Sequence, residues 1–421
     1  MPRSEKSIKD FKLLSDTRCR LLLLTFIALT LITIFSTINP DYNNDVLIEE
    51  KRPLAGYVID LNRIDEHCEP DNYNKSILKK YPMQDCLDYL DKKQFDYLIK
   101  PDSPKYCNEN DPMLFHVFWR GNVTDKLSLF IKSFLYTQPL KCSLLYVWLD
   151  DVNEDIQSNP YILQLLRFIG KNIEFKRWIT EDQLNFNPLF NGWERLLKKS
   201  NRKKVVGFSD LVRFTLLHRY GGMYFDADAL LLRDISPLYN LDIDFAYRWS
   251  VWKHYNTAIL RLHSNSTVGR LIIEAAMKNK LNFHPMSIRT YLVNKSIESM
   301  TRDDLNEHLY MMPVLLFDPL WLKADLHHKK IQLNPNLYRW QDAYNPTLLG
   351  NEFPGSVYDN STNPLELRKM NNFFRGAFTY HWHNQWKTII QPTSWLGVMQ
   401  TAYDAFLEGK DSNIYDEYLP L

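Results

Sequence analysis

The sequence has almost no net charge, because its 51 lysines and arginines nearly balance its 50 aspartates and glutamates. This balance favours neither a nucleic-acid-binding protein nor one with an acidic tail, so we expect no nucleic acid among its partners. Internal repeats and long low-complexity runs are also lacking. The chain is long, however, and its 421 residues with 45% apolar content can bury the core of one large domain or of two small ones.

Cysteine is scarce as well, and none of the five cysteines follows Cys142. Their spacings lack a CxxC, which argues against a structural zinc site. Cys19 lies at the edge of a hydrophobic run, and the other four are Cys68, Cys86, Cys107 and Cys142. In an oxidising compartment this even number predicts two disulfides, with three possible pairings.

One long hydrophobic run is present, LLLLTFIALTLITIFSTI, which covers residues 21–38 and contains no charge. A helix that spans a bilayer needs roughly 20 residues. Basic residues precede the run and acidic residues follow it, which predicts a cytosolic N-terminus and a lumenal body. A cleaved signal peptide is the alternative, and it also places the body in the secretory lumen. Five N-glycosylation sequons agree with that location, at Asn74, Asn122, Asn265, Asn294 and Asn360.

The chain divides into four zones. Residues 1–20 form a cytosolic tail, 21–38 the membrane anchor, 39–111 a lumenal stem that is partly helical over residues 86–99, and 112–421 the body. In the body, apolar runs alternate with helical patterns, which predicts an α/β fold with a largely parallel sheet covered on both faces. The predicted strands are 113–119, 144–149 and 173–178, and the predicted helices are 125–138 and 160–169. Ligands bind beyond the carboxyl ends of such strands, where Asp150 and Asp226 are expected.

The most informative stretch is GFSDLVRFTLLHRYGGMYFDADALLLRDISPL, residues 207–238. Ser209 is a good N-cap for a helix, and Asp210 and Arg213 share a face near the start of that helix. The pair Gly221-Gly222 ends the helix, and a short apolar strand then leads into an Asp-Ala-Asp motif.

Asp226 and Asp228 form that motif. If the chain is extended there, both carboxylates point to the same side, where they repel each other unless a cation lies between them. A hard divalent ion bound through oxygen meets this need and can also hold phosphates. Such an ion neutralises a nucleoside diphosphate leaving group as its bond to a sugar breaks. The motif therefore predicts a metal-dependent sugar transfer.

The run SDLVRFTLLHRYGGMYFDADALLLRDISPL resembles the DXD-containing sugar transferases of glycosyltransferase family 32, and the resemblance extends from about residue 113 to the C-terminus. It implies a GT-A fold, a Rossmann-like mixed sheet flanked by helices, for residues 112–421. It also implies transfer of a hexose or N-acetylhexosamine from a UDP- or GDP-sugar to a glycan or glycolipid, with Mn2+ or Mg2+ and with retention of configuration. Eukaryotic members are commonly type II Golgi membrane proteins, which agrees with the predicted anchor.

The resemblance also implies roles for individual residues. The expected metal ligands are Asp226, Asp228 and His381, with His383 as an alternative to His381. The residues expected to act in catalysis are Asp226, Asp228 and Arg213. The expected donor-binding residues are Asp210, Arg213, Tyr220, Asp226, Asn256, Asn384 and Trp386.

Further roles concern the two ends of the expected site. Residues 115–119 are expected near the nucleobase, and Trp249 and Trp252 on an acceptor-side loop. The chain departs from the animal α-1,4-galactosyltransferases at residues 309–321, LYMMPVLLFDPLW, where their Gly-His-Gln-Gly-Pro-like segment is missing. Galactose or lactosylceramide specificity is therefore not carried over. Asp318 in this stretch is a candidate acceptor-side or catalytic-support residue.

Two rival functions fit parts of the sequence. Some phosphoryl-transfer enzymes also carry a DxD after a strand, with the first Asp as nucleophile. They place it on the first strand of the domain, whereas here about 100 residues of strand-helix pattern precede Asp226. A non-catalytic lumenal binding protein, or a scaffold with a degenerate transferase fold, is the second rival, because the sequence does not show an acceptor pocket.

Overall fold

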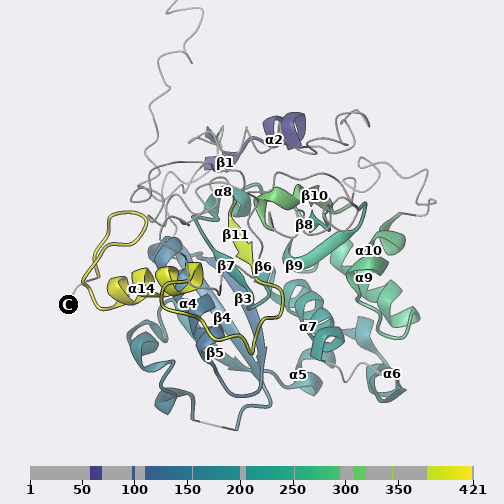
Figure 1. Cartoon of the computed structure of the whole chain (residues 1–421). Helices are drawn as coiled ribbons and strands as arrows, with labels where there is room; N and C mark the ends of the chain where they lie inside the picture. Colours follow the sequence, from purple (N-terminus) through teal and green to yellow (C-terminus); the bar gives the residue numbers. More distant parts are fainter. Residues whose placement is uncertain are drawn as a thin grey trace, which may run out of the picture. The chain divides into compact units, whose positions relative to one another are not determined.

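The computed structural model describes residues 57–68, 97–99, 110–153, 155–199, 205–250, 252–293, 308–318, 344 and 377–419. All of them fall within one compact unit, Glu50–Leu421 (Figure 1). The predicted anchor at 21–38 lies outside the described residues, as do Cys86, Cys107 and the sequons at Asn74, Asn294 and Asn360. Among the helices within the described ranges, none combines the length and the apolar character that a bilayer crossing requires.

Seven strands of the described residues form the central sheet, in the order β10-β8-β9-β6-β3-β4-β5 (Figure 1). They are β3 (Met113–Arg120), β4 (Ser143–Asp150), β5 (Ile173–Arg177), β6 (Gly222–Phe225), β8 (Phe245–Arg248), β9 (Tyr255–Leu262) and β10 (Tyr310–Met312). Only β9 runs against the others, because it pairs antiparallel with β6 and β8 while the remaining neighbours are parallel. The fold is therefore a mixed α/β fold with a mostly parallel sheet, as the alternating pattern predicted.

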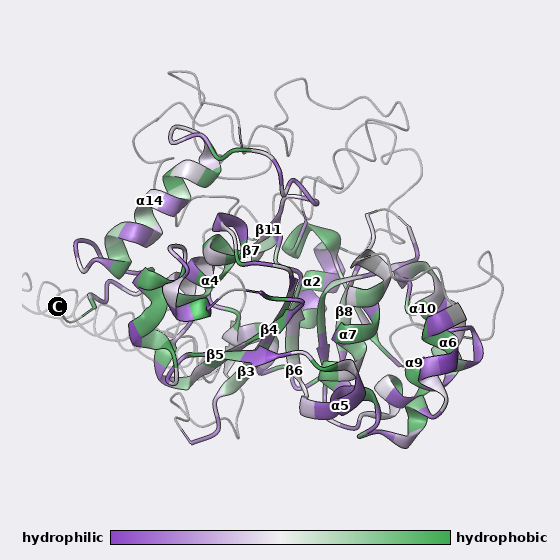
Figure 2. Cartoon of the chain, turned by 90° about the horizontal axis from the view of Figure 1, so that it is seen from below, coloured by the Kyte–Doolittle hydropathy of each residue, from purple (hydrophilic) through white to green (hydrophobic). Residues whose placement is uncertain are grey.

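Helices cover both faces of this sheet (Figure 2). The helices α4 (Asp125–Thr137) and α14 (Trp395–Leu407) lie on one side, and α7 (Val205–Tyr220), α9 (Thr267–Lys278) and α10 (Pro285–Leu292) on the other. Successive side chains of a strand point to opposite faces, and β6 shows the consequence. Met223 and Phe225 join the hydrophobic core beside α4, whereas Tyr224 joins the separate core beside α7.

The local predictions for the first half of the body are mostly confirmed. The three predicted strands are β3, β4 and β5, and the predicted helix at 125–138 is α4, whose N-cap Thr124 accepts a hydrogen bond from the Lys126 amide. The helix predicted at 160–169 is wrong, because the chain forms 3-10 turns at Ile156–Ser158 and Leu163–Phe168. The buried residues here are three apart, at Ile162, Leu165 and Phe168, which is the period of a 3-10 turn.

Helix α7 begins earlier than predicted. It starts at Val205, so Ser209 lies inside the helix instead of capping it. Nearly every side of α7 is buried between Phe208 and Leu217, so no polar face marked its start in the sequence. Its end is as predicted: Gly221 has a φ of +70° and Gly222 a φ of +92°. A side chain at Gly222 would also collide with the Leu114 carbonyl of β3, so glycine is required there.

Part of the region predicted as stem has regular structure. Strands β1 (Tyr57–Ile59) and β2 (Tyr97–Ile99) pair antiparallel, and α2 (Leu61–Cys68) follows β1. The helix predicted over 86–99 is therefore wrong at its end, where the chain pairs with β1, and residues 86–96 lie outside the described residues. The Tyr310 hydroxyl donates to Asp65 of α2 at 2.6 Å. Cys68 and Cys142 each take part in a disulfide, so the prediction that they are bridged is confirmed for these two of the four cysteines.

A second, two-stranded sheet brings the C-terminal region to the Asp-Ala-Asp motif. Strands β7 (Ala229–Leu231) and β11 (Thr379–His381) pair antiparallel. His381 lies opposite Ala229, the residue that follows the motif. This pairing places the predicted C-terminal histidine beside Asp228 although about 150 residues separate them in the chain.

A buried histidine in the sheet makes the stability of the fold sensitive to acid. His116 of β3 is fully buried; its Nε2 lies 2.9 Å from the Gly221 carbonyl, and its Nδ1 lies 3.1 Å from the indole N–H of Trp148. These partners require a neutral ring, since Nε2 must donate and Nδ1 must accept. Burial lowers the pKa of His116 to about 4.

We expect this group to cost the protein about 3 kcal/mol of unfolding free energy between pH 6.5 and pH 4. In that window His116 binds a proton in the unfolded chain but stays neutral in the folded chain. Its contribution to stability is therefore fully present above pH 6.5 and is lost as the pH falls. Urea unfolding at pH 7.5 and pH 4.5 measures the loss. The variant His116→Gln should lose less between the two pH values, and an unchanged pH dependence would contradict the assignment.

Candidate active site

A cavity of about 440 Å³ lies at the carboxyl ends of β3 and β6. It is lined by Phe118, Trp119, Arg120, Ser209, Asp210, Arg213, Tyr224, Asp226, Ala227, Asp228, Trp249, Asn256, Ala258, His284, Pro285, His381, His383, Asn384 and Trp386. This is the edge of the sheet at which an α/β fold binds its ligands. Most of the residues predicted from the sequence therefore meet in one place.

One part of the cavity wall is an arginine held by carboxylates. Arg213 of α7 is buried, and its guanidinium lies 2.9 Å from Oδ1 of Asp226, 3.3 Å from Asp210 and 2.8 Å from the Thr257 hydroxyl. Burial alone would lower the pKa of Arg213, but Asp226 and Asp210 outweigh burial and raise it. The arginine is therefore a fixed positive charge, and it holds Asp226 in one orientation.

A second part of the wall joins Asp228 to the C-terminal segment. The Asp228 carboxylate lies 3.2 Å from Nε2 of His381 and accepts a 2.7 Å hydrogen bond from the Asn384 amide. Burial would raise the pKa of Asp228, but His381 and the Asn384 N–H lower it to about 2. Burial would likewise lower the pKa of His381, yet the carboxylates of Asp228 and Asp318 raise it well above its usual value.

The backbone of the Asp-Ala-Asp motif is not extended. Residues 227 and 228 form a turn, closed by a 2.9 Å hydrogen bond from the Ala229 amide to the Asp226 carbonyl. The condition of an extended motif is therefore not met, because the chain turns from β6 into β7 at this point. As a result the two carboxylates take different partners, Arg213 for Asp226 and His381 for Asp228.

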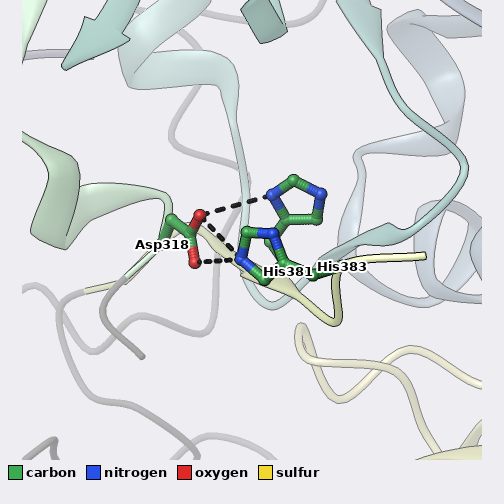
Figure 3. Close-up of side chains that lie close together, drawn as sticks. All are labelled: Asp318, His381 and His383. Atoms are coloured by element: carbon green, nitrogen blue, oxygen red, sulfur yellow. Dashed lines mark hydrogen bonds and ion pairs between the residues drawn. The ribbon is translucent and has the colours of Figure 1, made fainter. Parts of the chain in front are cut away.

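The two candidate histidines have different surroundings (Figure 3). His381 faces Asp228 through Nε2, whereas Nε2 of His383 lies 3.0 Å from Oδ2 of Asp318. Their rings stack with centroids 3.9 Å apart. His381 is thus the histidine next to the DxD motif, which the sequence alone left open.

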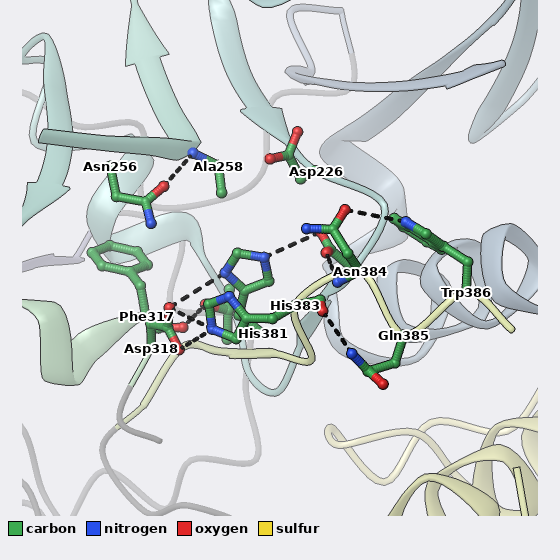
Figure 4. A network of polar contacts seen from close by, with 12 residues as sticks. Asp226, Asn256, Ala258, Phe317, Asp318, His381, His383, Asn384, Gln385 and Trp386 are labelled. Atoms are coloured by element: carbon green, nitrogen blue, oxygen red, sulfur yellow. Dashed lines mark hydrogen bonds and ion pairs between the residues drawn. The ribbon is translucent and has the colours of Figure 1, made fainter. Parts of the chain in front are cut away.

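The segment after His381 contributes His383, Asn384 and Trp386 to the cavity lining, and Figure 4 shows these side chains near His381. His383 and Asn384 both have left-handed backbones, with φ of +52° and +59°. A non-glycine residue in this region is strained, and consecutive cases persist only where the surroundings hold them. The Asn384 side chain accepts a hydrogen bond from the indole N–H of Trp386, and the Trp386 ring packs edge-on against Trp119 at 5.2 Å. The predicted pair Asn384 and Trp386 therefore belongs to the cavity wall and is contributed by the C-terminal part of the chain.

The end of β3 forms another part of the wall. Phe118, Trp119 and Arg120 line the cavity, while Phe115 and Val117 are core residues. Only the last part of the segment predicted to approach a nucleobase reaches the cavity, because the first part is buried inside the sheet. Arg120, which the sequence did not single out, also lies 3.3 Å from Asp150, the other strand-end aspartate.

The remaining wall lies around β9 and α10. Asn256 lines the cavity, and its side chain accepts a 2.9 Å hydrogen bond from the Ala258 amide (Figure 4). Trp249 also lines it, with its ring stacked on His284 at 6.3 Å, whereas Trp252 is exposed and lies outside the lining. His284 and Pro285 were missed by the sequence reasoning, since a His-Pro step before a helix carries no chemical motif.

Tyr220 is the one predicted donor-binding residue that the cavity lining does not include. It ends α7, next to the start of β6, and packs on Trp148 and His116 with ring centroids 5.5 Å and 6.0 Å away. The start of β6 is the amino end of the strand, opposite to the edge that carries the cavity. Its assignment to the donor site is therefore corrected.

Residues 105–256 match a protein family described as the glycosyltransferase sugar-binding region containing DXD motif. The matched segment contains Asp210, Arg213, Asp226 and Asp228, and it agrees with the resemblance to glycosyltransferase family 32. No match was found among curated protein sequences.

Among the solved structures that are similar to the chain, three illustrate the low level of identity. The PaToxG glycosyltransferase is 17% identical, with 52% of this chain and 75% of that chain covered and a TM-score of 0.31. The apo-form glycosyltransferase GlyE of Streptococcus pneumoniae TIGR4 is 11% identical, with coverage of 70% and 64% and a TM-score of 0.35. The UDP-bound glycosyltransferase domain from the YGT toxin is 12% identical, with coverage of 47% and 66% and a TM-score of 0.28.

Proposed function

We propose that the protein is a glycosyltransferase with a DXD sugar-binding region, which moves a hexose or N-acetylhexosamine from a nucleotide sugar to a glycan or glycolipid acceptor. One observation carries this proposal: the Arg213–Asp226 pair and the Asp228–His381 pair converge on a single cavity at the carboxyl edge of the sheet. The sheet order, with one antiparallel strand among six that run together, supports a GT-A type of fold.

A divalent cation, Mn2+ or Mg2+, belongs to this proposal, and the residues present fit one. Asp228 and His381 offer an oxygen and a nitrogen 3.2 Å apart on the cavity wall, a spacing that suits two ligands of one ion. Asp226 lies in the same turn, with Arg213 bonded to both of its oxygens. When bound, the ion supplies positive charge to the donor diphosphate.

The other cavity residues have roles that follow from their chemistry. Arg213 adds a fixed positive charge that stabilises the negative charge on the leaving diphosphate. Asp210 and Thr257 keep that arginine in place. Trp119 and Trp386 offer aromatic faces at the nucleotide end, and Trp249 offers one at the acceptor end.

We extend the proposal to the reaction outcome and to the location. The family resemblance supports retention of configuration at the transferred sugar. The hydrophobic run at 21–38, with basic residues before it, supports a single-pass type II protein of the Golgi membrane with a lumenal catalytic domain. The sequons at Asn122 and Asn265 lie on exposed parts of the described chain, which agrees with a lumenal location.

A screen of donors with Mn2+ tests the function. The full-length protein is heated with UDP-Gal, UDP-GlcNAc, UDP-Glc or GDP-Man, and the unfolding temperature is recorded. A ligand that binds only the folded state at 100 times its Kd adds about 2.7 kcal/mol of stability, so the correct donor should raise the unfolding temperature by several degrees.

Chelation provides the control for that screen. EDTA should abolish both the shift caused by the donor and the transfer of sugar, and added Mn2+ should restore both. Full transfer activity in EDTA would contradict the proposal that the reaction depends on a metal ion. Equal shifts with all four donors and with free UDP would show that the sugar is not recognised.

A further inference from the structure

A carboxylate with no part in the proposed reaction lies beneath the two histidines of the candidate site. Asp318 follows the 3-10 turn Val314–Leu316, is 1% exposed and is not among the residues that line the cavity. Its Oδ2 lies 3.0 Å from Nε2 of His383 and 3.4 Å from Nδ1 of His381 (Figure 3). Burying a carboxylate costs folding free energy unless the charge is paired. We therefore considered which interaction of Asp318 with the two imidazoles explains its position.

The simplest reason would be a metal site made of Asp318, His381 and His383, since one ligand atom of each lies within 4.8 Å of the others. The rings argue against it, because they stack at 3.9 Å with only 26° between their planes. The lone pair of an imidazole nitrogen lies in the plane of its ring, so a shared ion would have to lie in two nearly parallel planes at once. A carboxylate has two oxygens and can accept a hydrogen bond from each ring.

The two ring nitrogens of His381 have different surroundings, and this difference indicates the role of Asp318. Its Nε2 lies 3.2 Å from Asp228, which lines the cavity. Its Nδ1 faces inward, 3.4 Å from Asp318 and 3.3 Å from the Tyr247 hydroxyl. A histidine that binds a metal needs one bare nitrogen, and the hydrogen bond at the other nitrogen decides which one is bare.

We propose that Asp318 is a positioning residue, which holds the proton on Nδ1 of His381, so that Nε2, turned toward Asp228, is the nitrogen that gives up its proton and binds a divalent cation. His383 completes the arrangement, because its Nε2 donates to Asp318 and its ring stacks on His381. The two histidines then have separate tasks, one toward the ion and one toward the carboxylate. This inference rests on the proposed function, since it needs a cation at Asp228.

The test is the affinity of the full-length protein for Mn2+ without any donor, measured by electron paramagnetic resonance. The variant Asp318→Asn should bind Mn2+ about 10- to 100-fold more weakly, the usual effect of losing such a partner. The amide of asparagine can donate to Nδ1, which moves the ring proton to Nε2 and blocks the metal side.

A matched control exists in the same chain. Asp244 lies 2.7 Å from Nδ1 of His263, also a carboxylate on a histidine, but neither residue lines the cavity. The variant Asp244→Asn should bind Mn2+ as the wild type does. Wild-type affinity in Asp318→Asn would overturn this proposal alone, whereas a wild type that binds no Mn2+ would overturn the proposed metal dependence as well.

A second measurement needs no variant at Asp318 and covers the case in which Asp318→Asn fails to fold. In wild-type protein labelled with 15N-histidine and loaded with Zn2+, the nitrogen signals should show His381 with a proton on Nδ1 and none on Nε2. Loss of signals in a His381→Asn sample assigns the ring. A proton on Nε2 of His381 in the Zn2+-loaded protein would overturn the proposal.

Discussion

Replacing Asp228 by asparagine should reduce sugar transfer by at least about 100- to 1000-fold, the range seen when one group that stabilises developing charge is removed. The substitution keeps the size of the side chain and removes the negative charge that faces His381 at 3.2 Å. It also leaves only one oxygen on the side chain, which can no longer accept from the backbone N–H of Asn384 and face His381 with an oxygen at the same time. The measurement is the rate of donor hydrolysis and of transfer with saturating Mn2+.

The matched control for this loss is Asp242→Asn. Asp242 is more than half exposed and pairs with Arg261 and His263 outside the cavity lining, so its removal should leave the rate unchanged. Both variants are compared at a temperature at which circular dichroism shows them folded. An Asp228→Asn enzyme with more than a tenth of wild-type activity would show that Asp228 does not hold the reacting charges.

The parts of the fold that could be predicted are those with a local cause. An apolar run bounded by polar residues specifies a buried strand, and β3, β4 and β5 follow that rule within one or two residues. The 3-10 turn Leu163–Phe168 could not be told from a helix, since apolar residues three apart fit both. Strand β11 was missed because it is three residues long and forms only by pairing with β7.

The candidate site likewise contains contacts that could be predicted from the sequence and contacts that could not. Asp210 and Arg213 are three residues apart on one helix, so their contact follows from helical geometry. The bond from Arg213 to Thr257 and the contact of Tyr247 with His381 join residues 44 and 134 positions apart, and no local spacing indicates them. The choice between His381 and His383 depended on which of them lies against Asp228, which is likewise a property of the folded chain.

The second large effect expected concerns Arg213, whose removal should destabilise the fold by about 3–5 kcal/mol. The variant Arg213→Met keeps much of the buried volume but leaves Asp210 and Asp226 without their shared cation. Burial already raises the pKa of Asp226, so the loss of the arginine leaves a carboxylate that resists ionisation. Urea unfolding at pH 7.5 measures the difference in unfolding free energy.

A control on the same helix separates this effect from the loss of any arginine. Arg219 donates to Gln183 and lies over Phe186 at the surface end of α7. The variant Arg219→Met should cost about 1 kcal/mol or less, because its contacts are partly exposed. Equal destabilisation by the two variants would mean that the buried carboxylates are not the cause.

A double substitution then tests the cause directly. If the cost of Arg213→Met comes from the carboxylates of the buried Asp210 and the partly buried Asp226, which have lost their partner, removing one of those charges in Arg213→Met/Asp210→Asn should restore part of the stability. The coupling between the two sites should be about 1–3 kcal/mol in the cycle of single and double variants. Recovered stability without recovered transfer activity is the expected combination, because Asp226 would still lack the cation that orients it beside Asp228. Additive losses in the cycle would instead assign the role of Arg213 to packing against Tyr224, over whose ring its guanidinium lies at 5.1 Å.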